Sequence, residues 1–319
     1  MKRLNNLYKD IYNYNNIIFE IDEVCRNTKN KKHIEEVKAN KSQYISKIRK
    51  TLIDRNYKPG KYNVFKIYEP KERMIVSQNM FDKIVNHLVA RFIISPAILP
   101  CLIDQNVSSR IGLGVKAGIH YYQKYRHFYY NKYGEYYILR CDIHHFFNSI
   151  DHEILMKMVE RRIKDKEALS IVRTIVDSYD QGLGIGNMTS QILAIFYLND
   201  FDHFVKEELK IKGYVRYQDD FLLFSNSKKE LKEDLEKIKN FLLEHNNLYL
   251  NLKKTRIYKG DENFIFLGRD MYGRYAKHKE IRRRIGVRKI LYRHKIISLY
   301  SFACSVVNYD NLDKQTENQ

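Results

Sequence analysis

Three carboxylates in two apolar segments are the residues best suited to chemistry in this chain of 319 residues. Asp219 and Asp220 interrupt the strand-forming segment 213–225, which is typical of a β-hairpin with the acids at its turn. Asp142 lies near the end of a second strand-like segment, 136–147. An isolated Asp-Asp pair would indicate only a turn, because Asp is common there. Three carboxylates on neighbouring strands would instead repel one another and suit two divalent cations, which activate an attacking oxygen and stabilise a leaving phosphate oxygen.

The overall charge indicates a polyanionic partner. Lys and Arg number 57 against 38 Asp and Glu, giving a formal charge of +19. Nucleic acid is the leading candidate, and a membrane surface is disfavoured because the basic residues are spread along the chain. The four cysteines have no CxxC spacing, which favours a reducing compartment over a zinc site or disulfides. Arg91, Pro96 and Pro100 interrupt the most apolar span, 87–104, and no signal peptide is evident, so we expect a cytoplasmic protein that does not enter a membrane.

The elements that would position the acids form an α+β chain. Residues 1–57 have a helical pattern and end at a turn signal, so we expect an N-terminal helical extension. Strand-like segments at 62–68 and 74–76 predict a hairpin whose basic turn carries Lys71 and Arg73. Such a turn places cations against phosphates, although a charged turn is more commonly just solvated.

The rest of the chain alternates helical and strand patterns. A glycine-containing segment, 108–118, carries Arg110 and Lys116 and is weak evidence for a phosphate-binding loop. We further predict helices at 81–92, 187–198 and 228–245, and a helix that is capped by Ser149 or Asp151 and runs to about 179. Strands are predicted at 248–257 and 263–268. The chain would end in a basic helical region from 277 and a disordered tail at 310–319. The one-signed charge of Arg282, Arg283 and Arg284 favours a nucleic-acid backbone, with a solvated helix face as the alternative.

The order and spacing of these segments resemble a reverse transcriptase over about residues 60–295. The resemblance covers five motifs in order: 142–147, 185–191, 217–220 (the YxDD motif), 252–256 and 266–268. It implies a right-hand polymerase fold, with fingers and palm in 58–271, a short helical thumb and tail in 272–319, and a palm formed by an antiparallel sheet that carries the acidic hairpin. Its partners would be a template RNA with its primer and dNTPs.

The resemblance also assigns roles around the acids. Asp142 and Asp219 would hold two Mg²⁺ ions, with Mn²⁺ as an alternative. Asp220 would be a further ligand or an electrostatic support, and the backbone C=O of Ile143 another ligand. Phe147 would exclude a ribose 2′-OH, although most Phe residues simply pack in cores. The remaining dNTP contacts would be Lys71 and Arg73 in the fingers, Ile185, Gly186 and Gln191 around the base pair, and Lys254 or Lys253 as general acid to pyrophosphate. Nucleic-acid contacts would be Arg110, Lys116, Tyr217, Gln218, Arg282, Arg283 and Arg284.

One motif narrows the resemblance within the family. Most reverse transcriptases have Ser-Pro where this chain has Ser190-Gln191. The variant is similar to the enzymes of diversity-generating retroelements, which copy a template RNA with errors at adenines and work with a small basic oligomeric accessory protein. The alternatives are a retron-type or antiviral-defence reverse transcriptase, and an RNA-binding scaffold that has lost the chemistry.

Overall fold

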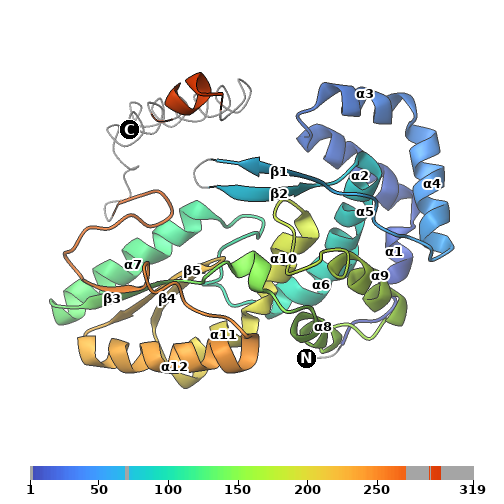
Figure 1. Ribbon diagram of the computed structural model, residues 1–319. Coiled ribbons are helices and arrows are strands. Elements are labelled where there is room, and N and C mark those ends of the chain that lie inside the picture. The colour runs from blue at the N-terminus through green and yellow to red at the C-terminus, as the bar shows by residue number, and fades with distance from the viewer. Residues whose placement is uncertain (1–2, 69–71, 271–286, 288, 296–319) are drawn as a thin grey trace.

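An antiparallel four-stranded sheet carries the acids, as the hairpin pattern predicts. The computed structural model describes residues 3–68, 72–270, 287 and 289–295. The sheet has the order β4-β5-β3-β6 (Figure 1). Its strands are β4 (Gly213–Tyr217), β5 (Asp220–Ser225), β3 (Tyr137–Asp142) and β6 (Arg256–Lys259). The register pairs Asp142 with Asp220, so segments far apart in sequence bring their carboxylates to one end of the sheet.

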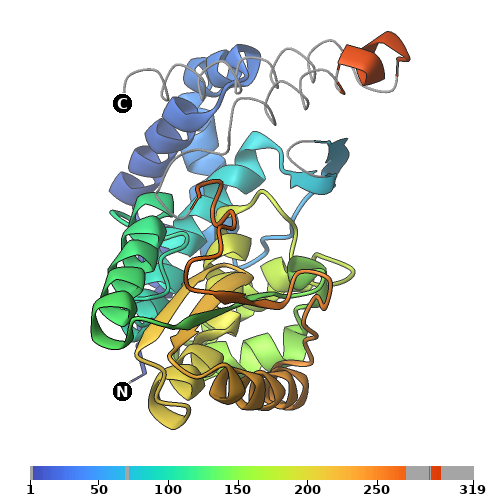
Figure 2. The same ribbon diagram turned by 90° about the vertical axis from the view of Figure 1, so that its left-hand side faces the viewer.

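Two helices of 19 residues cover opposite faces of this sheet, α7 (Val115–Tyr133) and α12 (Lys228–Asn246). The alternation of side chains along a strand explains the arrangement. Leu222 and Phe224 of β5 join the core beneath α7, whereas Phe221 and Leu223 join the core beneath α12. Figure 2 shows α7 and α12 on the two sides of the strands.

The predicted fingers hairpin is confirmed. Strands β1 (Asn63–Ile67) and β2 (Arg73–Ser77) pair in antiparallel register. Part of their turn, including Lys71, lies outside the described residues. The hairpin is tied to the rest of the fold because Val76 donates its N–H to the C=O of Ile185 at 3.0 Å.

A single helical run follows the hairpin, comprising α5 (Met80–Val89), the π-helix η1 (Ala90–Ile94), α6 (Ser95–Ile98) and the 3₁₀ turn η2 (Leu99–Cys101). Among the described residues it is the one helical segment long and apolar enough to cross a membrane. The prediction that Pro96 interrupts it is wrong, because Pro96 occupies the first turn of α6, where no intrahelical N–H donor is needed. Ile84, Leu88 and Ile93 are fully buried in the protein core, which accounts for the apolar composition.

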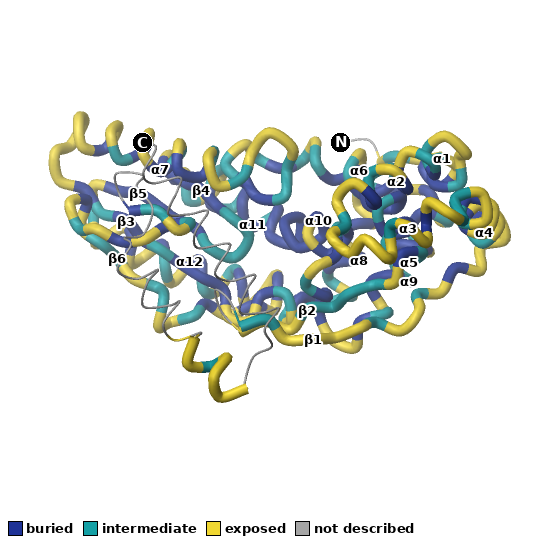
Figure 3. The backbone as a smooth tube through the Cα atoms, turned by 90° about the horizontal axis from the view of Figure 1, so that it is seen from above, coloured by how far each residue is buried: buried dark blue, intermediate teal, exposed yellow. Residues whose placement is uncertain are grey.

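The residues before the hairpin are helical, as predicted, in α1 (Tyr8–Ile11), α2 (Tyr14–Asn27), α3 (Lys31–Ala39) and α4 (Lys41–Ile53). They share one hydrophobic core with α5 and with the sheet face beneath α12. A buried carboxylate on α2, Glu20, pairs with Arg91 of η1. Figure 3 shows α10 (Met188–Tyr197) buried in the middle of the molecule and α4 exposed at its edge.

The helix predicted from residue 151 to about 179 is two helices, α8 (His152–Glu160) and α9 (Lys166–Val176). Asp151 caps the first, and the break arises because Asp165 caps the second through the N–H groups of Glu167 and Ala168. After α10 come α11 (Asn199–His203) and the π-helix η4 (Phe204–Glu208). The 3₁₀ turn η3 (Phe146–Ser149) lies between β3 and α8.

Two predicted strands are confirmed only in part. In 248–257, Leu250 forms a bridge to Ile143, and the chain then turns because Thr255 and Lys254 both donate N–H groups to the C=O of Asn251. The strand β6 begins only at Arg256, at the end of the predicted range. In 263–268, Phe266 and Arg269 exchange two backbone hydrogen bonds around a tight turn. The predicted thumb and tail lie largely outside the described residues, as do Arg282, Arg283 and Arg284.

Candidate active site

The hairpin between β4 and β5 places its two acids differently. Asp220 is the first residue of β5, whereas Asp219 lies in the turn. Gln218 before it adopts a left-handed conformation with φ of 56°. Ile143, the predicted backbone ligand, donates its N–H to the C=O of Asp219 at 3.2 Å. The end of β3 is therefore bonded directly to the acidic turn, and all three carboxylates gather at one end of the sheet.

Lys254 is bound to the carboxylate of Asp142. Its Nζ lies 2.5 and 2.6 Å from the two carboxylate oxygens, and Asn251 Nδ2 lies 3.2 Å from Oδ1. Lys253, the other predicted general acid, is exposed at the surface. The turn at 251–255 therefore selects Lys254 as the cation that faces the site.

Arg140 holds the carboxylate of Asp220. Its Nε and Nη2 donate to the two oxygens at 3.2 and 2.8 Å, and its Nη1 donates to the C=O of Ile265 at 2.7 Å. Such a bidentate pair orients the carboxylate as well as neutralising it. Of the two roles predicted for Asp220, electrostatic support fits this contact better. Sequence reasoning assigned no role to Arg140, although strand periodicity places residues 140 and 142 on one face.

The acids are harder to ionise than free carboxylates. Burial, and then the neighbouring Asp142, raises the pKa of Asp219 to about 6. Burial also raises the pKa of Asp220, although Arg140 acts in the opposite direction. Asp219 thus lacks the cation that each of its neighbours has, and a positive group beside it would relieve this cost.

The donor set suits hard divalent cations, which prefer carboxylate oxygens. As arranged, no three Asp, Glu, His or Cys side chains among the described residues are close enough to hold an ion. The contacts explain this, because Lys254 covers both oxygens of Asp142 and Arg140 draws Asp220 aside. The ammonium of Lys254 stands at Asp142 where a metal cation would bind, so Asp142 and Asp219 fit the role of ligands once Lys254 moves.

Phe147 is half-buried in η3, close to the acids in sequence. Its C=O accepts the N–H of Leu183 at 2.8 Å. A Cβ at Gly182 would lie 2.2 Å from that same oxygen, and Gly182 has φ of 61°, so only glycine fits there. The glycine-rich turn therefore fixes the backbone that carries Phe147.

The residues predicted to surround the base pair lie at the junction of fingers and palm. Gly186 has φ of 120° and packs against Ile75 and Val76 of β2. Ile185 is half-buried beside it, and Gln191 is exposed in the first turn of α10. A stacked pair that sequence reasoning missed, Tyr62 on Tyr179 at 5.2 Å, joins the fingers to the same turn.

The predicted nucleic-acid contacts divide into inward and outward groups. Arg110 turns inward, where its Nη1 donates to the C=O groups of Ile103 and Asn106 at 2.7 and 2.9 Å. Tyr217 is half-buried, and Gln218, also half-buried, donates to Ser109 Oγ at 2.9 Å. Lys116 is exposed, as is Arg73 of the predicted dNTP contacts.

A fully buried ion pair between Arg216 and Asp202 is bonded to the turn of the β4–β5 hairpin. Arg216 of β4 donates its Nε to Asp202 Oδ1 at 2.7 Å and its Nη1 to the C=O of Gln218 at 3.0 Å. Tyr214 donates to the same Asp202 oxygen at 2.7 Å. This network connects α11 to the left-handed residue of the acidic turn, and nothing in the strand pattern indicates it.

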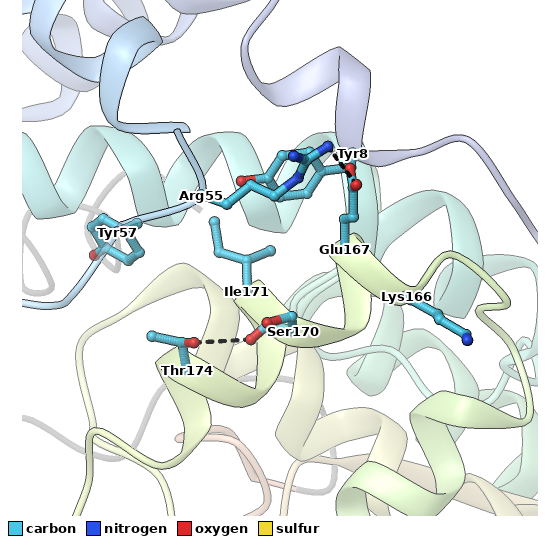
Figure 4. Close-up of a pocket in the computed structure, with 8 residues that line it drawn as sticks. All are labelled: Tyr8, Arg55, Tyr57, Lys166, Glu167, Ser170, Ile171 and Thr174. Carbon is cyan, nitrogen blue, oxygen red and sulfur yellow. Dashed lines mark hydrogen bonds and ion pairs between the residues drawn. The ribbon is translucent and has the colours of Figure 1, made fainter. Parts of the chain in front are cut away.

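A separate cavity of about 190 Å³ lies between the N-terminal helices and α9. Figure 4 shows two pairs among its lining residues, Arg55 with Glu167 and Thr174 with the backbone of Ser170. The cavity therefore lies where packed elements meet, and it is not lined by Asp142, Asp219 or Asp220.

Comparison with known proteins agrees with this architecture. The chain is 25% identical over 187 residues to protein YkfC of Escherichia coli K12, which covers 46% of this chain and 49% of that protein. It is 31% identical over 135 residues to the retron Ec73 reverse transcriptase of Escherichia coli, covering 38% and 43%. The chain thus spans about half the length of these curated relatives.

Solved telomerase structures share the fold. Telomerase from Candida albicans, in complex with a fragment of telomeric RNA, has a TM-score of 0.51 at 14% identity, covering 87% of this chain and 57% of that chain. The corresponding complex from Candida tropicalis has a TM-score of 0.52 at 13% identity, covering 88% and 56%. At these identities the likeness shows the fold alone, and that fold is the right-hand polymerase fold. The family model for reverse transcriptase (RNA-dependent DNA polymerase) matches residues 58–271, so the chain belongs to the reverse transcriptase family.

Proposed function

We propose that this protein copies an RNA template into DNA by nucleotidyl transfer at the three acids. The observation that carries the proposal is the pairing of Asp142 with the Asp219–Asp220 hairpin at one end of the palm sheet, with Lys254 on Asp142. A scaffold without chemistry would have no need for a half-buried, poorly neutralised carboxylate such as Asp219.

The chain's own residues have distinct tasks in this reaction. Asp142 and Asp219 hold the divalent ions, Mg²⁺ or alternatively Mn²⁺, and Arg140 keeps Asp220 oriented beside them. When bound, the two ions supply activation of the primer 3′-OH and stabilisation of the leaving pyrophosphate. Lys254 donates a proton to the departing pyrophosphate, and the ring of Phe147 excludes a ribose 2′-OH.

The proposed biological role is error-prone copying of a template RNA in a diversity-generating retroelement, in the cytoplasm and together with a small basic accessory protein. Its support is the Ser190-Gln191 variant and the position of Gly186 against the fingers, where a looser fit around the base pair would lower discrimination. The second candidate is a retron-type reverse transcriptase, including those of antiviral defence, which the 31% identity to the retron Ec73 reverse transcriptase favours.

Primer extension on a defined RNA template with Mg²⁺, followed by sequencing of the DNA product, separates these roles. Errors concentrated opposite template adenines support the retroelement role, whereas faithful extension moves the assignment to the retron-type or defence role. The absence of extension, even after cellular RNA and partner proteins are added, favours the scaffold.

The double substitution Asp219→Ala and Asp220→Ala tests the chemistry itself. We expect it to abolish extension and to leave RNA binding in place. Retained extension would contradict the assignment of the acids. If both activities are lost, the milder Asp219→Asn variant, which keeps the size of the side chain, is measured instead.

A further inference from the structure

The two long helices on the palm sheet differ sharply in charge. Helix α12 carries five Lys and five acidic residues, and several pair along the helix, such as Lys229 with Glu233 and Lys239 with Glu236. Helix α7 has the same length but carries four Lys or Arg residues and no Asp or Glu. The mixed charge of α12 is typical of a solvated helix face. The positively charged side chains of α7 repel one another, and a bound polyanion would offset this repulsion.

The exposed side chains of α7 form a ridge of alternating cations and rings. Residues four apart on a helix are neighbours on its surface. The ridge consists of Lys116, His120, Lys124, Phe128 and Lys132, all exposed. It spans roughly 24 Å at the rise of an α-helix. Because the buried side of α7 consists of other residues, including Tyr122, Tyr125 and Tyr129, the ridge is not needed for packing on the sheet.

Aromatic rings are unusually exposed at the C-terminal half of α7. Tyr130 is 65% exposed and Phe128 is 41% exposed. The Nζ of Lys132 lies 5.8 Å from the centre of the Phe128 ring and 5.1 Å from that of Tyr133. Exposed rings interleaved with cations suit unpaired bases, which stack on the rings while their phosphates meet the cations.

The N-terminal end of α7 is attached to the acidic hairpin. Gly114, its N-cap, donates its N–H to the C=O of Val107 at 2.8 Å, and Val107 donates to the C=O of Arg216 at 3.1 Å. Gln218 of the acidic turn bonds to Ser109 in the same loop. A strand that passes the hairpin therefore meets this loop first and the α7 ridge next.

We propose that the α7 ridge binds single-stranded RNA outside the catalytic centre, as a track for the part of the template that is not being copied. The charge and the exposed rings point to an unpaired nucleic acid, and the positive charge would repel a basic partner protein. The choice of RNA over DNA rests on the proposed function, since the template is present in full before any product exists.

The binding experiment compares matched charge reversals on the two helices. The variants are Lys124→Glu with Lys132→Glu on α7, and Lys229→Glu with Lys232→Glu on α12, which change the net charge equally. Equilibrium binding of the full chain to a fluorescently labelled single-stranded RNA of mixed sequence is measured across a salt series, without dNTPs or divalent metal. We expect the α7 variant to bind about tenfold more weakly and its salt slope to fall by about 1.4, for two lost phosphate contacts. The α12 variant should bind as the wild type does.

A second pair of variants tests the rings. Phe128→Ser on α7, at a ring of the ridge that is 41% exposed, is compared with Phe19→Ser on α2, where the ring is 46% exposed. We expect about tenfold weaker binding for Phe128→Ser with an unchanged salt slope, because a stacked base is lost rather than a phosphate contact. The Phe19→Ser variant should bind normally.

Three results would overturn the proposal. Equal losses in the α7 and α12 variants would show that only net charge matters, and unaltered RNA binding in the α7 variants would leave a protein as the occupant. Tighter binding of single-stranded DNA than of RNA of the same sequence would assign the ridge to the product strand. Because the measurement needs no polymerisation, its outcome is independent of the proposed activity, which primer extension tests separately.

Discussion

Asp219 is the one carboxylate of the three that has no cation in direct contact among the described residues. Lys254 neutralises Asp142 and Arg140 neutralises Asp220, so one negative charge remains on the half-buried Asp219. This imbalance raises the pKa of Asp219 to about 6. Positive charge added beside Asp219 would therefore lower its pKa and favour the ionised carboxylate.

The raised pKa predicts a pH-dependent cost to stability. Because the folded-state pKa of Asp219 lies above its unfolded value, the stability that protonation supplies is present at low pH and is lost as the pH rises to about 6. In EDTA, the free energy of unfolding of the wild type relative to Asp219→Asn should therefore fall by about 2 kcal/mol between pH 4.5 and 7.5. Urea unfolding at both pH values checks this, and a difference that does not change with pH would contradict it.

Lys254 and its neighbour Lys253 offer a matched comparison. Lys254→Met removes the cation on Asp142 and the proposed proton donor, so we expect the rate of single-nucleotide incorporation to fall by roughly 100-fold. Lys253→Met, at an exposed position, should have little effect. Rapid-quench measurement of one incorporation step separates the two, and equal losses would remove Lys254 from its assigned role.

At the scale of elements, the conformation of the β4–β5 hairpin depends on the buried ion pair between Arg216 and Asp202. β4 and β5 bring the acids together, but Arg216 and Asp202 fix the left-handed Gln218 that turns the chain. Both members of this ion pair are fully buried. Such a pair is costly to break, since the remaining charge has neither water nor partner.

Arg216→Met should destabilise the protein by about 3–5 kcal/mol, because it leaves Asp202 buried and unpaired. The control is Arg161→Met, which removes an exposed pair with Asp200 of 2.6 Å and should cost less than about 1 kcal/mol. Urea unfolding of both variants gives the two values. A small loss at Arg216 would show that the hairpin is held by its strand pairing alone.

At the scale of the whole molecule, the helices before residue 58 are part of the main core. Ile17, Ile21 and Val24 of α2 are fully or almost fully buried, and Glu20 between them is paired with Arg91 of η1. The predicted division into 1–57, 58–271 and 272–319 is a division by sequence pattern. The packing joins the first two of these segments through one continuous hydrophobic cluster.

A chain lacking residues 1–57 should therefore not fold cooperatively. Its loss would expose the apolar face of α5 and leave Arg91 without Glu20, each of which costs several kcal/mol against a total stability of about 5–15 kcal/mol. Circular dichroism during thermal unfolding checks this. A sharp transition in the shortened chain would contradict it, whereas recovery of the transition on adding a 1–57 peptide would support it.

The sequence by itself determined the elements whose pattern is local. The apolar, strand-forming runs in 213–225 predicted β4 and β5 with the acids at their turn, and the order of motifs predicted the polymerase fold that the family match confirms. Most helices were predictable for the same reason, because apolar spacing and capping residues act within a few positions of one another.

Only the tertiary structure decided which charges meet. Lys254 reaches Asp142 across 112 positions and Arg140 reaches Asp220 across 80, and no local pattern records such pairs. The same long-range contact overrode local propensity at 248–257, where Asn251 bonds to Asp142 and the chain turns instead of continuing as a strand. The physical reason is that propensity acts along the chain, whereas a buried carboxylate takes its partner from whichever segment the fold brings nearest.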